Sequence, residues 1–293
     1  MKDFRDKVAA VTGAGSGIGR ALALQLAAEG ARVAISDWDA TGLAETAALL
    51  EEAGATPHST VLDVRDRAAV HAWADAVADR LGGVNLVVNN AGITIFGTVE
   101  ESPYEDIEKV IDVDFWGVVH GTKAFLPHLI ASGDGHVVNV SSVFGLFGVP
   151  TQSSYNAAKF AVRGFTEALR QEMLVDGHPV GVTCVHPGGI RTNIVNNATA
   201  SNAADISGIA RVFEERLTRT SPETAARTIL RGVRARRPKV LIGADAVAVD
   251  LVVRVLGAAY QRPFAAVSRR LTASLQAPTT RPVGAAARKK ASA

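Results

Sequence analysis

The chain has 293 residues, of which 47% are hydrophobic and 20% are charged, and its formal net charge at pH 7 is +2. This length allows one large α/β domain or two small ones, each with a core of its own. The small net charge argues against a nucleic-acid-binding protein, because such proteins depend on many phosphate contacts. A single cysteine, Cys184, excludes an internal disulfide and a multi-cysteine metal site.

We expect a cytoplasmic protein. Residues 1–7 contain no apolar segment of the signal-peptide type. No run of about 18 uncharged apolar residues occurs, so no membrane-spanning helix is expected.

Short runs rich in valine, alanine and isoleucine alternate with longer helical patterns along most of the chain. The expected strands are 8–12, 32–36, 59–63, 86–89, 136–141, 180–185 and 239–242. Helical patterns follow the first two strands at 19–29 and 41–53. Strands separated by helices form a mostly parallel sheet through right-handed crossovers. The sequence therefore predicts an α/β fold, a single doubly wound Rossmann domain with seven strands, whose ligands bind beyond the carboxyl ends of the strands.

Residues 12–19 read Thr-Gly-Ala-Gly-Ser-Gly-Ile-Gly between the first strand and the first helix. Glycines allow a tight turn and the close approach of backbone to a pyrophosphate, whose charge the helix N-terminus stabilises. Glycines also gather in loops for packing reasons, but Asp37 at the end of the second strand favours a dinucleotide site. A carboxylate there accepts hydrogen bonds from ribose hydroxyls and repels a 2′-phosphate. Together with Ser16 in the loop and Trp38 after the acid, Asp37 predicts NAD over NADP; a helix-capping role fits Asp39 better.

Tyr155 and Lys159 stand four residues apart in a helical pattern, so their side chains share one face of the helix. One interpretation is an ordinary polar pair on a solvated surface. The other is a phenol whose proton is loosened by an adjacent cation, which is the chemistry of an acid–base catalyst. The pair alone leaves both interpretations open.

Four motifs in the same order resemble those of the short-chain dehydrogenase/reductase family over roughly residues 5–243. They are Thr-Gly-x-x-x-Gly-x-Gly at 12–19, Asn-Asn-Ala-Gly at 89–92, Tyr155-x-x-x-Lys159 with Ser142 placed 13 residues before the tyrosine, and His-Pro-Gly at 186–188 with Thr192. Their order and spacing are far more specific than any one motif. The resemblance implies an NAD-dependent oxidoreductase acting on alcohol or ketone groups, and it decides for the catalytic interpretation of the Tyr155–Lys159 pair.

The resemblance also implies the roles of the catalytic residues. Tyr155 is expected to pass a proton to or from the substrate oxygen, although a free phenol has a pKa of about 10. Lys159 and the positively charged oxidised nicotinamide are expected to lower that pKa. Lys159 should also hold the nicotinamide ribose. Ser142 should orient the substrate oxygen, and Ser141 is expected to be a backbone-side neighbour.

The resemblance also implies which residues bind the cofactor. Asp63 and Val64 match the pair that brackets the adenine, and Asn89 matches a structural asparagine beside the cofactor. The segment after the sixth strand should line the nicotinamide end, although Ile190 could simply be core. The expected cofactor-binding residues are Gly13, Ser16, Gly17, Ile18, Gly19, Asp37, Asp63, Val64, Asn89, Ala91, Gly92, Tyr155, Lys159, Pro187, Gly188, Ile190 and Thr192.

One position departs from the family pattern. Where the family carries an asparagine in Asn-x-x-Gly, this chain has Asp114 followed by Gly117. In the family this residue helps to hold a water that links the catalytic lysine to solvent. Asp114 could accept a hydrogen bond from that water; its charge would stabilise the lysine cation and disfavour tyrosinate. If backbone groups carry the relay, we expect a working enzyme with a modestly altered pH profile. If the side-chain amide carries it, the enzyme is slow and Asp114→Asn raises its rate.

The expected substrate loop, 189–220, and the segment after the fifth strand are rich in apolar residues. Phe144 and Phe147 are the expected substrate contacts beside Ser142 and Tyr155, and the lining offers no obvious arginine for a carboxylate apart from Arg191. The sequence therefore favours a hydrophobic secondary alcohol or ketone over a sugar acid or a phosphate ester.

The Rossmann domain is expected to span 1–243, followed by a helical extension at 244–276 and a basic tail at 277–293 that is predicted to be disordered. The extension repeats apolar residues at helical spacing beside arginines. Such a face could make peripheral contact with a membrane through 245–275, or it could pack on its own domain or on a partner subunit.

Two other functions are alternatives to this one. An NADPH-dependent ketoreductase is disfavoured by Asp37 and by the lack of a basic residue in the glycine loop. A dinucleotide-binding sensor without turnover should lack Ser142, Tyr155 or Lys159, and all three are present. Related enzymes pair through the helices that hold 104–131 and 154–174, so the resemblance implies a homodimer or homotetramer.

Overall fold

The computed structural model describes residues 1–191, 199–200 and 220–276, with side chains up to 191 and from 220 to 269. In this part of the chain seven strands form one sheet in the order β3-β2-β1-β4-β6-β7-β9, and all neighbouring pairs are parallel. The strands are β1 (Val8–Thr12), β2 (Arg32–Asp37), β3 (His58–Val61), β4 (Leu86–Asn89), β6 (Gly135–Val140), β7 (Val180–Pro187) and β9 (Lys239–Ile242). The predicted doubly wound sheet of seven strands is confirmed.

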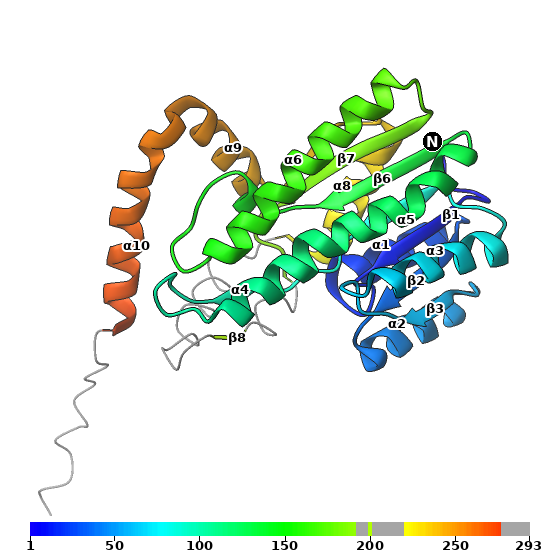
Figure 1. The fold of residues 1–293 in the computed structure, drawn as a ribbon, viewed down its shortest axis with the longest axis horizontal. Coiled ribbons are helices and arrows are strands. Elements are labelled where there is room, and N and C mark those ends of the chain that lie inside the picture. Colours follow the sequence, from blue (N-terminus) through cyan, green and yellow to red (C-terminus); the bar gives the residue numbers. More distant parts are fainter. Residues whose placement is uncertain (192–198, 201–219, 277–293) are drawn as a thin grey trace, which may run out of the picture.

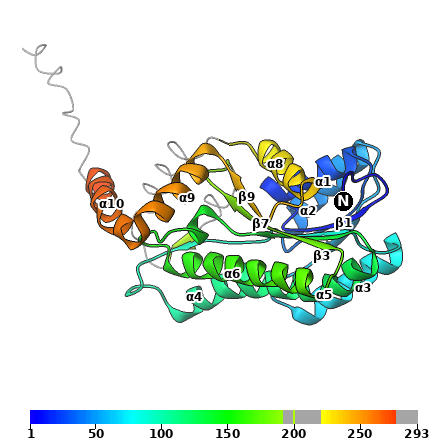
Figure 2. The ribbon, with the colours of Figure 1, turned by 90° about the horizontal axis from the view of Figure 1, so that it is seen from above.

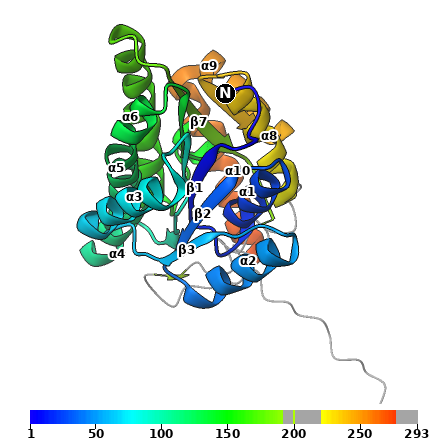
Figure 3. The same cartoon turned by 90° about the vertical axis from the view of Figure 1, so that its right-hand side faces the viewer.

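Helices cover both faces of the sheet (Figure 1, Figure 3). One face carries α1 (Gly17–Ala28), α2 (Ala40–Glu52) and α8 (Pro222–Arg234), and the other carries α3 (Arg67–Leu81), α4 (Tyr104–Ile111), α5 (Gly117–Ala131) and α6 (Ser153–Val175).

Burial on both faces explains the unbroken apolar strands. In β1, Ala9 and Val11 belong to the cluster that includes side chains of α1 and α8, whereas Val8 and Ala10 belong to the cluster that includes side chains of α3 and α5. Because successive side chains of a strand point to opposite faces, a strand that is covered on both sides is apolar throughout.

The bounds of the elements differ from the expected ones at a few ends. Strand β2 includes Asp37, β3 ends before Asp63, and α1 begins at Gly17. Two features were not expected. A short parallel pair joins β5 (Ile95–Phe96) to β8 (Thr199–Ala200). A π-helical turn, η1 (Asp112–Trp116), lies between α4 and α5.

The predicted C-terminal helical extension is present as α9 (Ala244–Leu256), a 3₁₀ turn η3 (Gly257–Tyr260) and α10 (Gln261–Gln276). Figures 1 and 2 show α9 and α10 as an arch beyond the carboxyl ends of the strands. Asp250 ties α9 to β9 through an ion pair with Lys239. None of the described helices has the length and apolar character needed to cross a bilayer. The expected tail at 277–293 lies outside the described residues.

Candidate active site

The glycine-rich turn joins β1 to α1 at the carboxyl edge of the sheet. Gly13 and Gly17 have positive φ angles of 64° and 53°, which a residue with a side chain rarely adopts. A Cβ on Gly19 would lie 2.0 Å from Gly13 O, and a Cβ on Gly13 would lie 2.8 Å from Ala91 Cα. The turn is therefore packed too closely for side chains at these positions. Ser16, Gly17 and Ile18 are only half-buried, so this part of the turn is accessible at the N-terminus of α1, where a pyrophosphate would bind.

Asn90 fixes this turn, a role that was not predicted from the sequence. Its Nδ2 donates to Thr12 O at 3.0 Å and to Gly13 O at 3.1 Å. Thr12 Oγ1 in turn accepts from the backbone N–H groups of Asn90 and Ala91 at 3.0 and 3.1 Å. Asn90 stands in the matched motif at 89–92, but only the spatial proximity of β1 and β4 reveals what its side chain holds.

Asn89 occupies a different environment from its neighbour. It is almost fully buried, and its Nδ2 donates to Asn139 Oδ1 at 2.8 Å and to Thr122 Oγ1 at 3.1 Å. The network links β4 to α5 and β6 just below the end of the sheet. Contact of Asn89 with the cofactor stays a prediction, while its structural role is evident from these bonds.

Asp37 lies at the end of β2 with its carboxylate held beside the glycine turn. Its Oδ2 accepts from Gly15 N at 2.8 Å, and its Oδ1 accepts from Asp39 N at 3.0 Å. Asp39 caps α2 by accepting from Thr41 N at 3.0 Å, as expected. A half-buried carboxylate fixed by backbone donors keeps lone pairs for ribose hydroxyls, so the site fits an adenosine with a free 2′-hydroxyl.

The expected adenine pair lies after β3. Asp63 forms an ion pair with Arg65 at 2.6 Å, and the hydrogen bond from that guanidinium holds the pKa of Asp63 below its usual range. Val64 is buried, and its carbonyl oxygen lies 3.1 Å from His120 Nδ1. A Cβ on Gly117 would lie 2.7 Å from Val64 Cγ2, which explains the glycine at that position of α5.

Ser142, Tyr155 and Lys159 come together at the carboxyl end of β6. Ser142 follows the strand, while Tyr155 and Lys159 stand on successive turns of α6, and all three are buried. Lys159 Nζ lies 5.4 Å from the centroid of the Tyr155 ring. Ser141 donates to Lys159 O at 2.8 Å, so it supports the helix backbone as expected. The surface-pair interpretation of the tyrosine and the lysine therefore does not fit their burial.

Asp114 forms a buried ion pair with Lys159. The Lys159 Nζ–Asp114 Oδ2 distance is 3.0 Å, and the exposed fractions of the two side chains are 3% and 0%. Asp114 Oδ1 accepts from Ile93 N at 2.8 Å. Asp114 lies in the middle of η1, and π-helical turns of this kind are frequent at functional sites. A Cβ on Gly92 would lie 3.3 Å from both charged atoms of the pair, so the glycine leaves room for the contact.

Burial and the neighbouring charges both shift the pKa values of Tyr155 and Lys159. Burial raises the pKa of Tyr155 above its usual range; the Lys159 cation lowers it, Asp114 raises it further, and a hydrogen bond with Ser142 lowers it. Burial alone would lower the pKa of Lys159, but the charges of Asp114 and Tyr155 outweigh burial and raise it. The expectation that Lys159 makes Tyr155 more acidic therefore holds for that one interaction, whereas the net shift in this structure has the opposite sign because the phenol is buried.

The expected nicotinamide end is built where β7 meets α9. Gly188 N donates to Ile242 O at 2.9 Å, and Gly189 N donates to Asp245 Oδ2 at 2.7 Å. Pro187 ends β7, and Ile190 is buried in the core cluster that Val185 and Ile229 share. Thr192 and most of the expected substrate loop lie outside the described residues.

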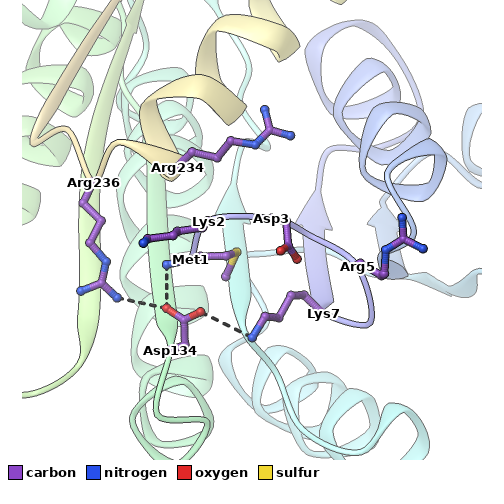
Figure 4. Close-up of a pocket in the computed structure, with 8 residues that line it drawn as sticks. All are labelled: Met1, Lys2, Asp3, Arg5, Lys7, Asp134, Arg234 and Arg236. Atoms are coloured by element: carbon purple, nitrogen blue, oxygen red, sulfur yellow. Dashed lines mark hydrogen bonds and ion pairs between the residues drawn. The ribbon is translucent and has the colours of Figure 1, made fainter.

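Other features of the described chain contribute no competing site. No group of three or more His, Cys, Asp or Glu side chains in the described ranges could hold a metal ion. Cys184 is buried, and burial raises the pKa of its thiol to about 12, which leaves it unreactive at neutral pH. Figure 4 shows a pocket lined by Met1, Lys2, Asp3, Arg5, Lys7, Asp134, Arg234 and Arg236. Because Asp134 directly precedes β6, this pocket lies at the amino end of the sheet, opposite the predicted site.

A parallel doubly wound sheet with a glycine turn after β1 and a buried Tyr-x-x-x-Lys pair on α6 defines a dinucleotide-dependent oxidoreductase. A family model described as short chain dehydrogenase matches residues 7–203. This match covers more than half of the chain, and the protein belongs to that family.

Known relatives agree with this assignment. The chain is 59% identical over 266 residues to a Mycobacterium tuberculosis protein named "Putative oxidoreductase SadH", a match that covers 91% of this chain and 96% of the relative. It is 31% identical to a Burkholderia phymatum short-chain dehydrogenase/reductase in complex with NAD, with a TM-score of 0.82 over 87% of this chain and 95% of that one. A Mycobacterium paratuberculosis short chain dehydrogenase bound to NAD is 26% identical, with a TM-score of 0.72 over 82% of this chain and 97% of the other.

Proposed function

We propose that the protein is an NAD-dependent dehydrogenase or reductase that interconverts a hydrophobic secondary alcohol and its ketone. The observation that carries this proposal is the buried cluster of Ser142, Tyr155 and Lys159 at the same edge of the sheet as the glycine turn. An acid–base group and a cofactor site at the same edge of the sheet are what hydride transfer to or from a carbon–oxygen bond requires.

Tyr155 is the acid–base residue of this proposal. Because burial raises the pKa of Tyr155, its phenol carries a proton at neutral pH, the form that donates to a ketone oxygen during reduction. During oxidation the phenolate must form first, and the Lys159 cation favours it. Ser142 holds the substrate oxygen beside the phenol. The bound cofactor supplies or accepts the hydride.

Asp37 supports NAD as the cofactor. Its carboxylate is fixed by Gly15 and Asp39 at the position where a 2′-phosphate would meet a negative charge. The structural neighbours in complex with NAD support the same choice. Arg20, the basic side chain nearest in sequence to the glycine turn, donates to Gly15 O and pairs with Glu45 at 2.8 Å, so its charge is already engaged.

The substrate is proposed to be apolar. Phe144 and Phe147 follow Ser142 and pack with Tyr155 in one cluster. An apolar lining beside a few polar groups suits a hydrophobic alcohol or ketone.

Assembly and membrane contact are proposed from exposed apolar side chains. Trp116 and Phe160 are exposed, and they lie on the π turn and on α6, where related enzymes pair; they support a homo-oligomer. On the extension, Leu251 and Val255 are exposed beside Arg254, which supports peripheral contact with a membrane surface. We also propose 1–243 as the catalytic domain and 244–276 as an appended helical segment.

Turnover tests the proposal. We would supply NAD or NADP with a panel of hydrophobic secondary alcohols, and NADH or NADPH with the matching ketones, and follow the absorbance of the reduced cofactor. We expect turnover with NAD and its loss in Tyr155→Phe. Turnover that requires NADP would favour the ketoreductase alternative. Tight NAD binding without turnover on any member would favour the sensor alternative.

A further inference from the structure

A row of aromatic rings leads from the proposed acid–base residue to the C-terminal extension. The ring of Tyr155 lies 5.9 Å from that of Phe144, which lies 5.6 Å from that of Phe147. Phe147 then contacts Phe264 of α10 at 5.3 Å and Tyr260 of η3 at 6.2 Å. All four contacts are edge-to-face, the arrangement that aromatic pairs prefer.

The extension is held in this position by polar contacts at its start and at the turn between its two helices. At its start, Asp245 accepts from Gly189 N at 2.7 Å, within the segment expected to line the nicotinamide end. At the turn between the helices, the Tyr260 hydroxyl accepts from Gly148 N at 2.8 Å. The first contact joins the extension to the segment after β7, and the second joins it to the segment that follows Ser142.

The two faces of α9 have different surroundings. Val249 and Val253 pack against the cluster that contains Phe147 and Tyr155. On the other face Val255 is 74% exposed and Leu251 is 62% exposed. The inner face therefore belongs to the surroundings of the reaction site, whereas the outer face does not contribute to it.

We propose that Tyr260 and Phe264 form the outer wall of the substrate pocket and select substrates with an extended apolar chain. This inference rests on the proposed function, which places the reacting carbon beside Tyr155. The row of rings then gives a direction: a chain attached to that carbon would lie along Phe144 and Phe147 and lead toward the extension. Because Tyr260 and Phe264 are only half-buried, a substrate chain can cover surface that is still open to water. Short alcohols end before Phe264 and gain nothing from it.

A homologous series of linear 2-alkanols, from four to ten carbons, tests the proposal. In the native protein kcat/KM should rise about fourfold per methylene, the factor that corresponds to about 0.8 kcal/mol of burial. In Phe264→Ala the ratio of kcat/KM for the ten-carbon alcohol to that for the four-carbon alcohol should fall about tenfold or more. The value for the four-carbon alcohol should stay unchanged. Val255→Ala, an exposed position on the outer face of α9, is the matched control and should leave the whole series unchanged.

One result would overturn the proposal: an unchanged ratio of kcat/KM for long and short alcohols in Phe264→Ala, whether both values fall equally or neither falls. Calorimetric binding of the ten-carbon methyl ketone separates this inference from the proposed function. Weaker binding by Phe264→Ala than by Val255→Ala supports the wall even if no alcohol in the series turns over. Equal binding by the two variants removes it even if turnover with NAD is found.

Discussion

The buried pair of Asp114 and Lys159 leads to a prediction that needs no knowledge of the substrate. Opposite unit charges 3.0 Å apart attract by about 5.5 kcal/mol at an effective dielectric constant of about 20. The exposed fractions of 3% and 0% leave little room for screening by solvent. Removing one partner leaves the other charge buried and uncompensated, which costs about 3–5 kcal/mol. We therefore expect Asp114→Asn and Lys159→Met each to lower the free energy of unfolding by that amount.

A double-mutant cycle measured by urea unfolding at pH 7.5 tests this reasoning. The variant with both substitutions should lose less than the sum of the single losses, with a coupling of at least about 2 kcal/mol. The exposed pair Arg163–Glu167, at 2.9 Å on α6, is the matched control and should show a coupling below about 1 kcal/mol. Additive losses at Asp114 and Lys159 would refute the view that the two residues stabilise the fold as an ion pair.

The same Asp114→Asn variant decides between the two hypotheses for this position. Equal rates for the native protein and the variant across pH 6 to 10 would exclude the idea that the missing amide makes the enzyme slow. We favour an active native enzyme, because Asp114 already holds Lys159 and accepts from the backbone of Ile93.

Three further predictions concern titration and cofactor choice. Burial lowers the pKa of His136 to about 3, so the folded state binds fewer protons than the unfolded state between about pH 6.5 and 3, and stability falls with falling pH across that window. Between pH 7 and pH 5 the free energy of unfolding of His136→Gln, measured with urea, should fall by about 2 kcal/mol less than that of the native protein. Parallel plots of this free energy against pH for the two proteins would contradict the prediction. Because the pKa of Tyr155 is raised above 10.0, the ultraviolet difference between the native protein and Tyr155→Phe should show no phenolate below pH 10, and a neutral-pH phenolate would contradict the burial argument. Asp37→Ser should lower the ratio of kcat/KM with NAD to kcat/KM with NADP by about tenfold or more, and tenfold corresponds to about 1.4 kcal/mol. An unchanged ratio would assign the preference for NAD to other residues.

The features predicted from sequence are those encoded locally. The strand pattern and the glycine turn identify the doubly wound sheet, and the spacing of Tyr155 and Lys159 places both on one helix face. The features that were missed depend on contacts between distant segments. Asn90 holds a turn 77 residues away, and Tyr260 bonds to a backbone group 112 residues away. No pattern within one helix or strand reports such contacts.

For Asp114 the sequence predicted the residue's importance but not its structural setting. The departure from the family's asparagine was visible in the sequence, and it mattered because a carboxylate beside the lysine must change the charge balance of the site. Its position could not be predicted, since a π-helical turn in a run that otherwise continues α4 into α5 has no local sequence signal in this chain. The net pKa of Tyr155 was likewise beyond prediction, because burial decides its sign.

The most direct test of the central claim is to trace the transferred hydrogen. A secondary alcohol carrying deuterium on its hydroxyl-bearing carbon would be incubated with NAD and the native protein or Tyr155→Phe, and the reduced cofactor would be analysed by mass spectrometry. We expect deuterated NADH with the native protein and a rate lower by at least about a hundredfold with Tyr155→Phe. Deuterium transfer at the same rate in both proteins would contradict the role of Tyr155, and NAD binding without any transfer across the substrate panel would contradict the proposed enzyme.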